Sequence, residues 1–342
     1  MRVESAAMNI PDPRAAGSCP RLRSGVSPRG GRFVLLSFLW LGITLVTSIG
    51  TLPVSLQWFN VQELDIAVRH APSPRPIVPY EKYDADSRFP AVARIAHYTV
   101  SWFGHDDLGR SLLYRLLPGF LVSLAMGLAA AMMAVAIGVT WGATAALAGG
   151  RVDFIMMRFV DVLYGLPYIL MVILLKIGLT RPLATLFGGH TRGADLVILL
   201  LAIGGVSWLT MARVIRGQVL SLRAQPFVEA ARACGAGSFR ILYRHLLPNL
   251  IGPIAVYATL AIPQAMLQES FLSFLGIGVQ QPTPSLGRLA ADGVQAVNSF
   301  VGYWWLIVFP CATLVLTLLA LNFIGDALRD AYDPRSKTVT LT

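Results

Sequence analysis

Six long runs of apolar residues alternate with shorter polar stretches along this sequence. A helix needs about 20 mostly apolar residues to cross bilayer hydrocarbon, because that layer is about 30 Å thick. Each run is long enough, so the pattern predicts an all-α integral membrane protein with six transmembrane helices. We expect these helices at residues 33–52, 120–148, 154–179, 195–214, 250–275 and 303–325.

The predicted spans divide the chain into two tails, a large loop and a helical core. We interpret the first span as a retained helix, since its leader, rich in Arg, Pro and Gly, is longer than a typical signal-peptide n-region. The expected parts are an N-terminal tail (1–32), the first transmembrane helix (33–52), a loop with the start of the second helix (53–119), a five-helix core (120–325) and a C-terminal tail (326–342).

Composition excludes several classes of protein. Of the 342 residues, 55% are hydrophobic and 13% are charged, against about 25% charged residues in soluble domains. Disordered chains are poor in apolar residues, and three widely spaced cysteines indicate neither a disulfide framework nor a metal site. The net charge of +10 comes from bases dispersed between apolar runs, which argues against nucleic acid as a partner and favours a lipid membrane.

The distribution of basic residues predicts the orientation in that membrane, because cytoplasmic loops carry an excess of Lys and Arg. Six spans place both termini on one side, and most of the 28 Lys and Arg residues fall in the tails or in the second and fourth connections. Acidic residues offset many of the bases in 53–119. Both termini and residues 217–248 are therefore expected to be cytoplasmic, and the loop within 53–119 periplasmic.

Small residues recur at every fourth position of the second span, at Ala134, Gly138, Gly142, Ala146 and Gly150. Such a seam lets another backbone approach closely, which promotes helix association where lipid removes the hydrophobic drive. A general richness in Ala and Gly is the alternative. Prolines inside apolar runs favour kinks, and they are found at Pro167, Pro253, Pro263 and Pro310.

Residues 217–248 are too charged to span a membrane and too patterned for a passive loop. Pro226 suits a first helical turn, and Gly235 suits the end of a helix. The pattern predicts a short cytoplasmic helix in which Glu229 lies near the positive end of the helix dipole. Two alanines follow Glu229 and leave little bulk beside it, as docking into a partner's groove requires.

This stretch resembles the EAA loop of ABC importer permeases, the element that docks on the ATPase subunit. The resemblance rests on a Glu-Ala-Ala triplet, on a glycine four residues after it and on a Leu-Pro pair. The general motif favours Ile at the position of His245. The form found here, Arg244-His245-x-Leu247-Pro248, instead resembles the dipeptide, oligopeptide and nickel branch of the family. The implied ATPase-coupling residues are Glu229, Ala230, Ala231, Gly235, Arg244, His245, Leu247 and Pro248.

Further motifs between residues 104 and 335 resemble the same branch, in particular its second, C-type permease subunit. They lie at 104–110, at 269–278 and at 325–334. The first of these motifs departs from the usual pattern at His105, where the family commonly has Thr.

The resemblance implies the type I ABC importer permease architecture and a role as the transmembrane subunit of an ATP-driven importer in the bacterial inner membrane. Such a subunit moves oligopeptides, dipeptides or related small solutes from periplasm to cytoplasm. The implied partners are ABC ATPase subunits, a sister permease that forms a heterodimer, and a periplasmic substrate-binding protein. Peptides, nickel complexes, glycosides and peptide antibiotics are all cargo within the family, and the sequence leaves the choice among them open.

No catalytic motif supports an enzyme, and no cofactor is implied. A Walker A motif needs Lys after Gly to hold phosphates, and none of Lys82, Lys176 and Lys337 follows a glycine. The G-x-S-x-G and H-E-x-x-H motifs of hydrolases are missing from the sequence as well. We therefore expect ATP hydrolysis to occur on a separate polypeptide.

Two acidic residues inside predicted spans, Asp161 and Glu269, are candidates for the translocation path, since ionisable groups at lipid depth tend to face a cavity or a partner. The structural alternatives are a pair between Asp161 and Arg158, one turn away, and bonds from Glu269 to neighbouring helices or to residues 276–293. In an ion-gradient-driven secondary transporter, the alternative function, either carboxylate would be the coupling group. The EAA-like loop argues against that function and against a non-transporting scaffold.

Overall fold

The computed structural model describes residues 28–58, 62, 70–73, 98–99, 101–186, 192–296 and 302–332. Its helices are α1 (Pro28–Gly50), α2 (Leu52–Trp58), α5 (Leu112–Ala148), α6 (Gly150–Tyr164), α7 (Tyr168–Leu186), α8 (Arg192–Arg223), α9 (Pro226–Ala233), α10 (Ser238–Ile241), α11 (Leu247–Phe274), α12 (Leu286–Ala296) and α13 (Trp305–Tyr332), with a π-helical stretch at Leu242–Leu246. Six of the described helical stretches are long and apolar enough to cross a membrane. The predicted all-α architecture with six spans is confirmed.

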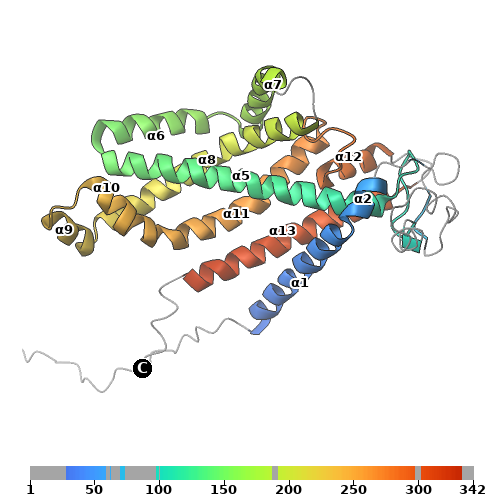
Figure 1. Ribbon diagram of the computed structural model, residues 1–342, viewed down its shortest axis with the longest axis horizontal. Helices are drawn as coiled ribbons and strands as arrows, with labels where there is room; N and C mark the ends of the chain where they lie inside the picture. The colour runs from blue at the N-terminus through green and yellow to red at the C-terminus, as the bar shows by residue number, and fades with distance from the viewer. Residues whose placement is uncertain are drawn as a thin grey trace, which may run out of the picture.

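The helices α5, α8 and α11 run side by side through the centre of the bundle (Figure 1). α13 packs against α11 and α1 on one side, and α6 and α7 pack against α8 on the other. One end of the bundle carries α9 and α10, which we call the α9 end; the opposite end carries α2 and α12, which we call the α12 end. The predicted tails up to residue 27 and from residue 333, and most of the loop at 53–103, lie outside the described residues.

Several helices extend beyond the apolar runs that predicted them. α5 begins at Leu112 instead of residue 120, and α8 continues to Arg223. Both extensions contain arginines that hydropathy treats as the end of a span, such as Arg115 and Arg216. In the structure these side chains form ion pairs with carboxylates of the same bundle, so they are tolerated inside long helices. Residues 326–332, predicted as tail, continue α13.

The third predicted span, 154–179, is wrong as a single helix. α6 ends at Tyr164, α7 begins at Tyr168, and only α7 has the length and apolar character of a span. Pro167 explains the break, because proline lacks the N–H that would continue α6 and disfavours helical geometry at the residue before it. Pro253, Pro263 and Pro310, by contrast, remain inside α11 and α13.

The seam of small residues on α5 is closely approached by α8. A Cβ atom added to Gly142 would lie 2.4 Å from the carbonyl oxygen of Ala212, and one added to Gly138 would lie 2.5 Å from the Cβ of Met211. The predicted backbone contact is therefore confirmed at these two positions. Gly150 does not belong to it, because this residue begins α6 with a φ of +53° and has open space beside it.

We expect Gly142→Val to disrupt the contact between α5 and α8, since the new side chain would meet backbone that cannot move away. Overpacking of this kind costs roughly 1–3 kcal/mol. The check is the thermal unfolding midpoint of the purified protein in detergent. Gly217→Val is the matched control on α8, because nothing lies within 4 Å of a Cβ at that glycine; equal midpoints for the two variants would contradict the close approach.

Candidate functional site

The predicted short helix is present as α9, and its two faces differ. Pro226 lies in its first turn, and Gly235, with a φ of +80°, follows its last residues. Val228 is fully buried in a cluster that joins the ends of α8 and α11, and Ala231 packs against the same cluster. Glu229 is exposed on the other face. α9 is therefore anchored on one side and free to contact a partner on the other.

The other residues of the predicted coupling set lie at the same end of the bundle. The π-helical stretch follows α10 directly and contains Arg244 and His245, and α11 begins with Leu247 and Pro248. The exposed members are Ala230, Gly235, Arg244 and Pro248, and the half-buried ones are His245 and Leu247. The α9 end thus gathers the whole set, whose role in docking stays a prediction.

Two aromatic side chains on the α9 end escaped the sequence analysis. Phe239 is 72% exposed and Tyr243 is 58% exposed. Their ring centroids lie 4.5 Å apart. The available signal was an aromatic pair four residues apart in a polar stretch, which places both rings on one helix face. The pair enlarges the exposed surface beside α9 with apolar area.

Asp161 is held by α8 and not by the neighbouring turn of α6. An Nη2 atom of Arg213 donates to Asp161 Oδ1 at 2.7 Å, and the guanidinium carbon lies 4.0 Å from the centroid of the Tyr164 ring. The expected pair with Arg158 is therefore wrong. An arginine from another helix can bind the carboxylate and stack on the ring together, and spacing within α6 cannot reveal such a partner.

A second ion pair fixes the beginning of α6 to α8. Arg216 donates from Nε and Nη2 to the two carboxylate oxygens of Asp153, both at 2.6 Å. These hydrogen bonds hold the pKa of the Asp153 carboxyl below its usual value. Because both ion pairs join the same two helices, α6 and α8 are expected to move together.

Glu269 lies inside the bundle as the centre of a hydrogen-bond network. Ser123 of α5 donates to one carboxylate oxygen at 2.9 Å, and Ser273 donates to the other at 2.7 Å. The same serines accept bonds from the backbone N–H groups of Leu286 and Val279. Glu269 is fully buried, so its position supports the structural alternative: it joins α5, α11 and the segment that begins α12.

Charged side chains are also buried at the α12 end. Asp106 accepts hydrogen bonds from Arg110 Nε and Arg115 Nη1, both at 2.7 Å, and from two backbone N–H groups at 2.9 Å. Arg115 reaches Asp292 of α12 at 3.3 Å. Removing one member of such a buried set leaves another charge without a partner, which is strongly destabilising. The cluster therefore fixes the segment before α5 onto α5 and α12.

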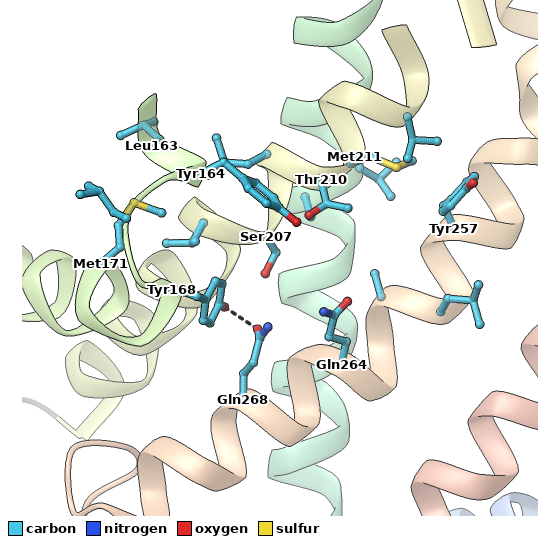
Figure 2. Close-up of a pocket in the computed structure, with 18 residues that line it drawn as sticks. Leu163, Tyr164, Tyr168, Met171, Ser207, Thr210, Met211, Tyr257, Gln264 and Gln268 are labelled. Carbon is cyan, nitrogen blue, oxygen red and sulfur yellow. Dashed lines mark hydrogen bonds between the residues drawn. The ribbon is translucent and has the colours of Figure 1, made fainter. Parts of the chain in front are cut away.

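A cavity of about 380 Å³ opens between α5, α8, α11 and the break that separates α6 from α7 (Figure 2), and some of its lining residues, among them Tyr164, Thr210 and Gln264, are exposed. Non-helical backbone at membrane depth is tolerated where it is buried in protein or lines a cavity, and the position of this break agrees with that rule. Sequence analysis missed the cavity, which no local pattern specifies. Its polar lining includes Tyr164, Tyr168, Ser207, Thr210, Gln264 and Gln268.

Residues 134–338 match the family described as binding-protein-dependent transport system inner membrane component. This match covers more than half of the chain. The chain belongs to this family. Its members' description implies a substrate-binding protein as a partner and an inner membrane as the location, and it agrees with the resemblance drawn from the EAA-like loop.

The chain is also similar in sequence to individual permease proteins. The chain is 44% identical over 236 residues to the oligopeptide transport system permease protein OppC of Haemophilus influenzae, which covers 69% of this chain and 71% of that protein. It is also 44% identical over 234 residues to the dipeptide transport system permease protein DppC of Bacillus subtilis, which covers 68% of both chains.

A solved structure shares the fold. A chain of the MetNI methionine ABC transporter in an inward-facing conformation matches with a TM-score of 0.52 and 19% identity, over 65% of this chain and 98% of that one. Together the comparisons confirm a type I ABC importer permease fold. The protein is a multi-pass inner-membrane permease subunit of an ABC importer, and the ion-gradient-driven alternative is set aside.

The buried histidine at the α12 end predicts how stability depends on pH. His105 is fully buried, and neither ring nitrogen has a hydrogen-bond partner among the residues that the structure describes. Burial, followed by the nearby His70, lowers the pKa of His105 from 6.5 to about 4. Between these values the unfolded chain binds a proton that the folded chain does not. Stability is therefore expected to fall as the pH drops through this window.

His105→Thr should remove that contribution, which amounts to roughly 3 kcal/mol between pH 7 and pH 4. The measurement is the unfolding midpoint of wild type and variant in detergent at several pH values. A constant difference between the two proteins would report packing alone. Only a wild type that loses stability more steeply than the variant below pH 6.5 supports a neutral buried imidazole.

Proposed function

We propose that this chain is the C-type permease of an ABC importer for oligopeptides or dipeptides, and that α9 docks on the ATPase subunit. The names of the relatives OppC and DppC support the substrate class. The geometry of α9 is the observation that carries the docking proposal: Val228 anchors the helix to the bundle, and Glu229 points away from it.

The contacts of α9 supply a route by which motion of an ATPase would reach the membrane. α9 follows the end of α8 after two residues, and Val228 shares a buried cluster with Val219 of α8 and Leu246 before α11. Arg223, at the end of α8, donates a hydrogen bond to the carbonyl oxygen of Ala146 on α5. A force on the exposed face of α9 would therefore act on the helices that line the cavity.

The contacts of α9 also suggest how the chain would be oriented and assembled with its partners. The α9 end and both termini would face the cytoplasm, where ATP is hydrolysed on separate ATPase subunits. A sister permease would pair with this chain to complete the path, and a periplasmic binding protein would deliver the peptide at the α12 end. The basic residues of the α9 end, among them Arg232, Arg240 and Arg244, support this orientation.

Of the two acidic path candidates, we retain Asp161. Its ion pair with Arg213 is partly exposed and stacks on Tyr164, a residue of the cavity lining. The pair would therefore border the path without adding net charge to it. Glu269 is assigned a structural role, because its carboxylate is buried and bound by serines.

Charge reversal on α9 tests the docking. Glu229→Arg is expected to reduce the amount of ATPase subunit that co-purifies with the permease from native membranes in mild detergent, since it reverses the charge on the face proposed to dock. Asp330→Arg is the matched control, because Asp330 is an exposed acidic residue near the end of α13. It should retain as much ATPase as the wild type.

Folding must be intact for this comparison, so each variant is first checked by gel filtration and thermal unfolding. Equal ATPase retention by wild type and by folded Glu229→Arg would refute docking through this face. Loss in both variants would point to a general charge effect and would also count against the proposal.

A further inference from the structure

The cavity between α5, α8, α11 and the break after α6 is lined by hydrogen-bonding side chains but by no charged ones. Among the 18 described residues that line it, none is Asp, Glu, Lys, Arg or His. The polar groups are hydroxyls and two side-chain amides, set among aliphatic and aromatic residues (Figure 2). The volume of about 380 Å³ lies within the range of ligand pockets, about 300–1,000 Å³.

The two amides occupy one face of α11. Gln264 and Gln268 are four residues apart, so their side chains project from the same side of the helix. The hydroxyl of Tyr168 donates to Gln268 Oε1 and thereby joins the beginning of α7 to α11. Gln264 makes no hydrogen bond with the other residues lining the cavity (Figure 2). The amide of Gln268 is thus engaged within the protein, while that of Gln264 is exposed and has its donors and acceptor free among the described residues.

Two charges beside the lining residue Tyr164 neutralise each other. Asp161 and Arg213 form an ion pair at 2.7 Å, and the guanidinium stacks on the ring of Tyr164. An unpaired charge at membrane depth would interact strongly with a charged solute, because Coulomb energies grow as the dielectric constant falls. A paired and stacked arginine contributes much less. The cavity can therefore form hydrogen bonds with a solute without favouring a positive or a negative charge on it.

We propose that Gln264, Gln268 and Tyr168 form a contact site for the main-chain amides of a peptide in transit, and that this site is indifferent to the charge of the peptide's side chains. The inference rests on the proposed function as a peptide importer. A side-chain amide offers one acceptor oxygen and two N–H donors, so it can pair with the C=O and N–H groups that every peptide carries.

The hydrogen bond between Tyr168 and Gln268 pairs the two side chains with each other when no peptide is bound. While no peptide is present, each group satisfies part of the other's hydrogen-bonding capacity. An arriving peptide amide replaces that bond with two bonds of its own, one to the hydroxyl and one to the side-chain amide. Entry and exit then exchange one set of hydrogen bonds for another, which keeps binding shallow enough for release.

Peptide uptake by the complete importer in proteoliposomes tests this site. The substrates are three tripeptides, Ala-Lys-Ala, Ala-Gln-Ala and Ala-Glu-Ala, offered with the same binding protein throughout. Gln264→Leu is expected to reduce uptake of all three by a similar factor, about two- to tenfold, as for one lost hydrogen bond. Gln218→Leu is the matched control on α8, since Gln218 is not part of the cavity lining.

Gln264→Glu provides the second arm, because it adds a negative charge in place of a neutral amide. Relative to wild type, it should raise the ratio of Lys-peptide to Glu-peptide uptake by about tenfold or more. Each variant is used only after it assembles with the ATPase subunits in wild-type yield.

The possible outcomes distinguish a failure of the cavity proposal from a failure of the proposed importer function. If wild type imports the peptides but neither Gln264 variant changes uptake or its charge ratio, the cavity proposal fails and the importer proposal stands. If Gln264→Leu slows only one charge class, the site is not charge-indifferent. If wild type imports none of the three peptides, the proposed function fails and the site assignment falls with it.

Discussion

The backbone approach of α5 and α8 is the constraint on which the other features of this protein depend. At Gly138 and Gly142 α5 has no side chain of its own, so α8 lies directly against its backbone. That contact sets the position of α8 along its length, from the cavity lining at Ser207 to the turn that begins α9. A lever at the α9 end can act on a membrane cavity only if the helix between them is held in a fixed path.

Polar pairs between helices add the specificity that apolar packing lacks in a lipid environment. Arg213 and Arg216 join α8 to α6, and the carboxylate of Glu269 joins α11 to Ser123 of α5. Each group would be costly if left without a partner in the bilayer. Helices that slide past one another would lose these partners, and the bundle therefore has few alternative registers.

Local sequence patterns predicted what depends on local chemistry. Hydropathy located the six spans, and Pro226 and Gly235 predicted the two ends of α9. The four-residue spacing of small residues predicted a close helix contact, and the structure identifies α8 as the partner. The break after α6 was missed because apolar residues continue through it, although Pro167 stands there. The partner of Asp161 and the cavity depend on residues from several helices, whose juxtaposition no single stretch of sequence encodes.

The π-helical stretch at Leu242–Leu246 sets the rotational phase of the helix that follows. A π-helical turn contains an additional residue compared with an α-helical one, and each residue turns an α-helix by about 100°. An additional residue in a purely α-helical connection would therefore turn the membrane helix out of phase with the α9 end, whereas the wider π-helical turn absorbs it. The amide-bearing face of α11 thus keeps its direction toward the cavity although the connection holds one more residue than an α-helix would, so the geometry of this turn is as much a part of the sequence information as the residues of the two regions.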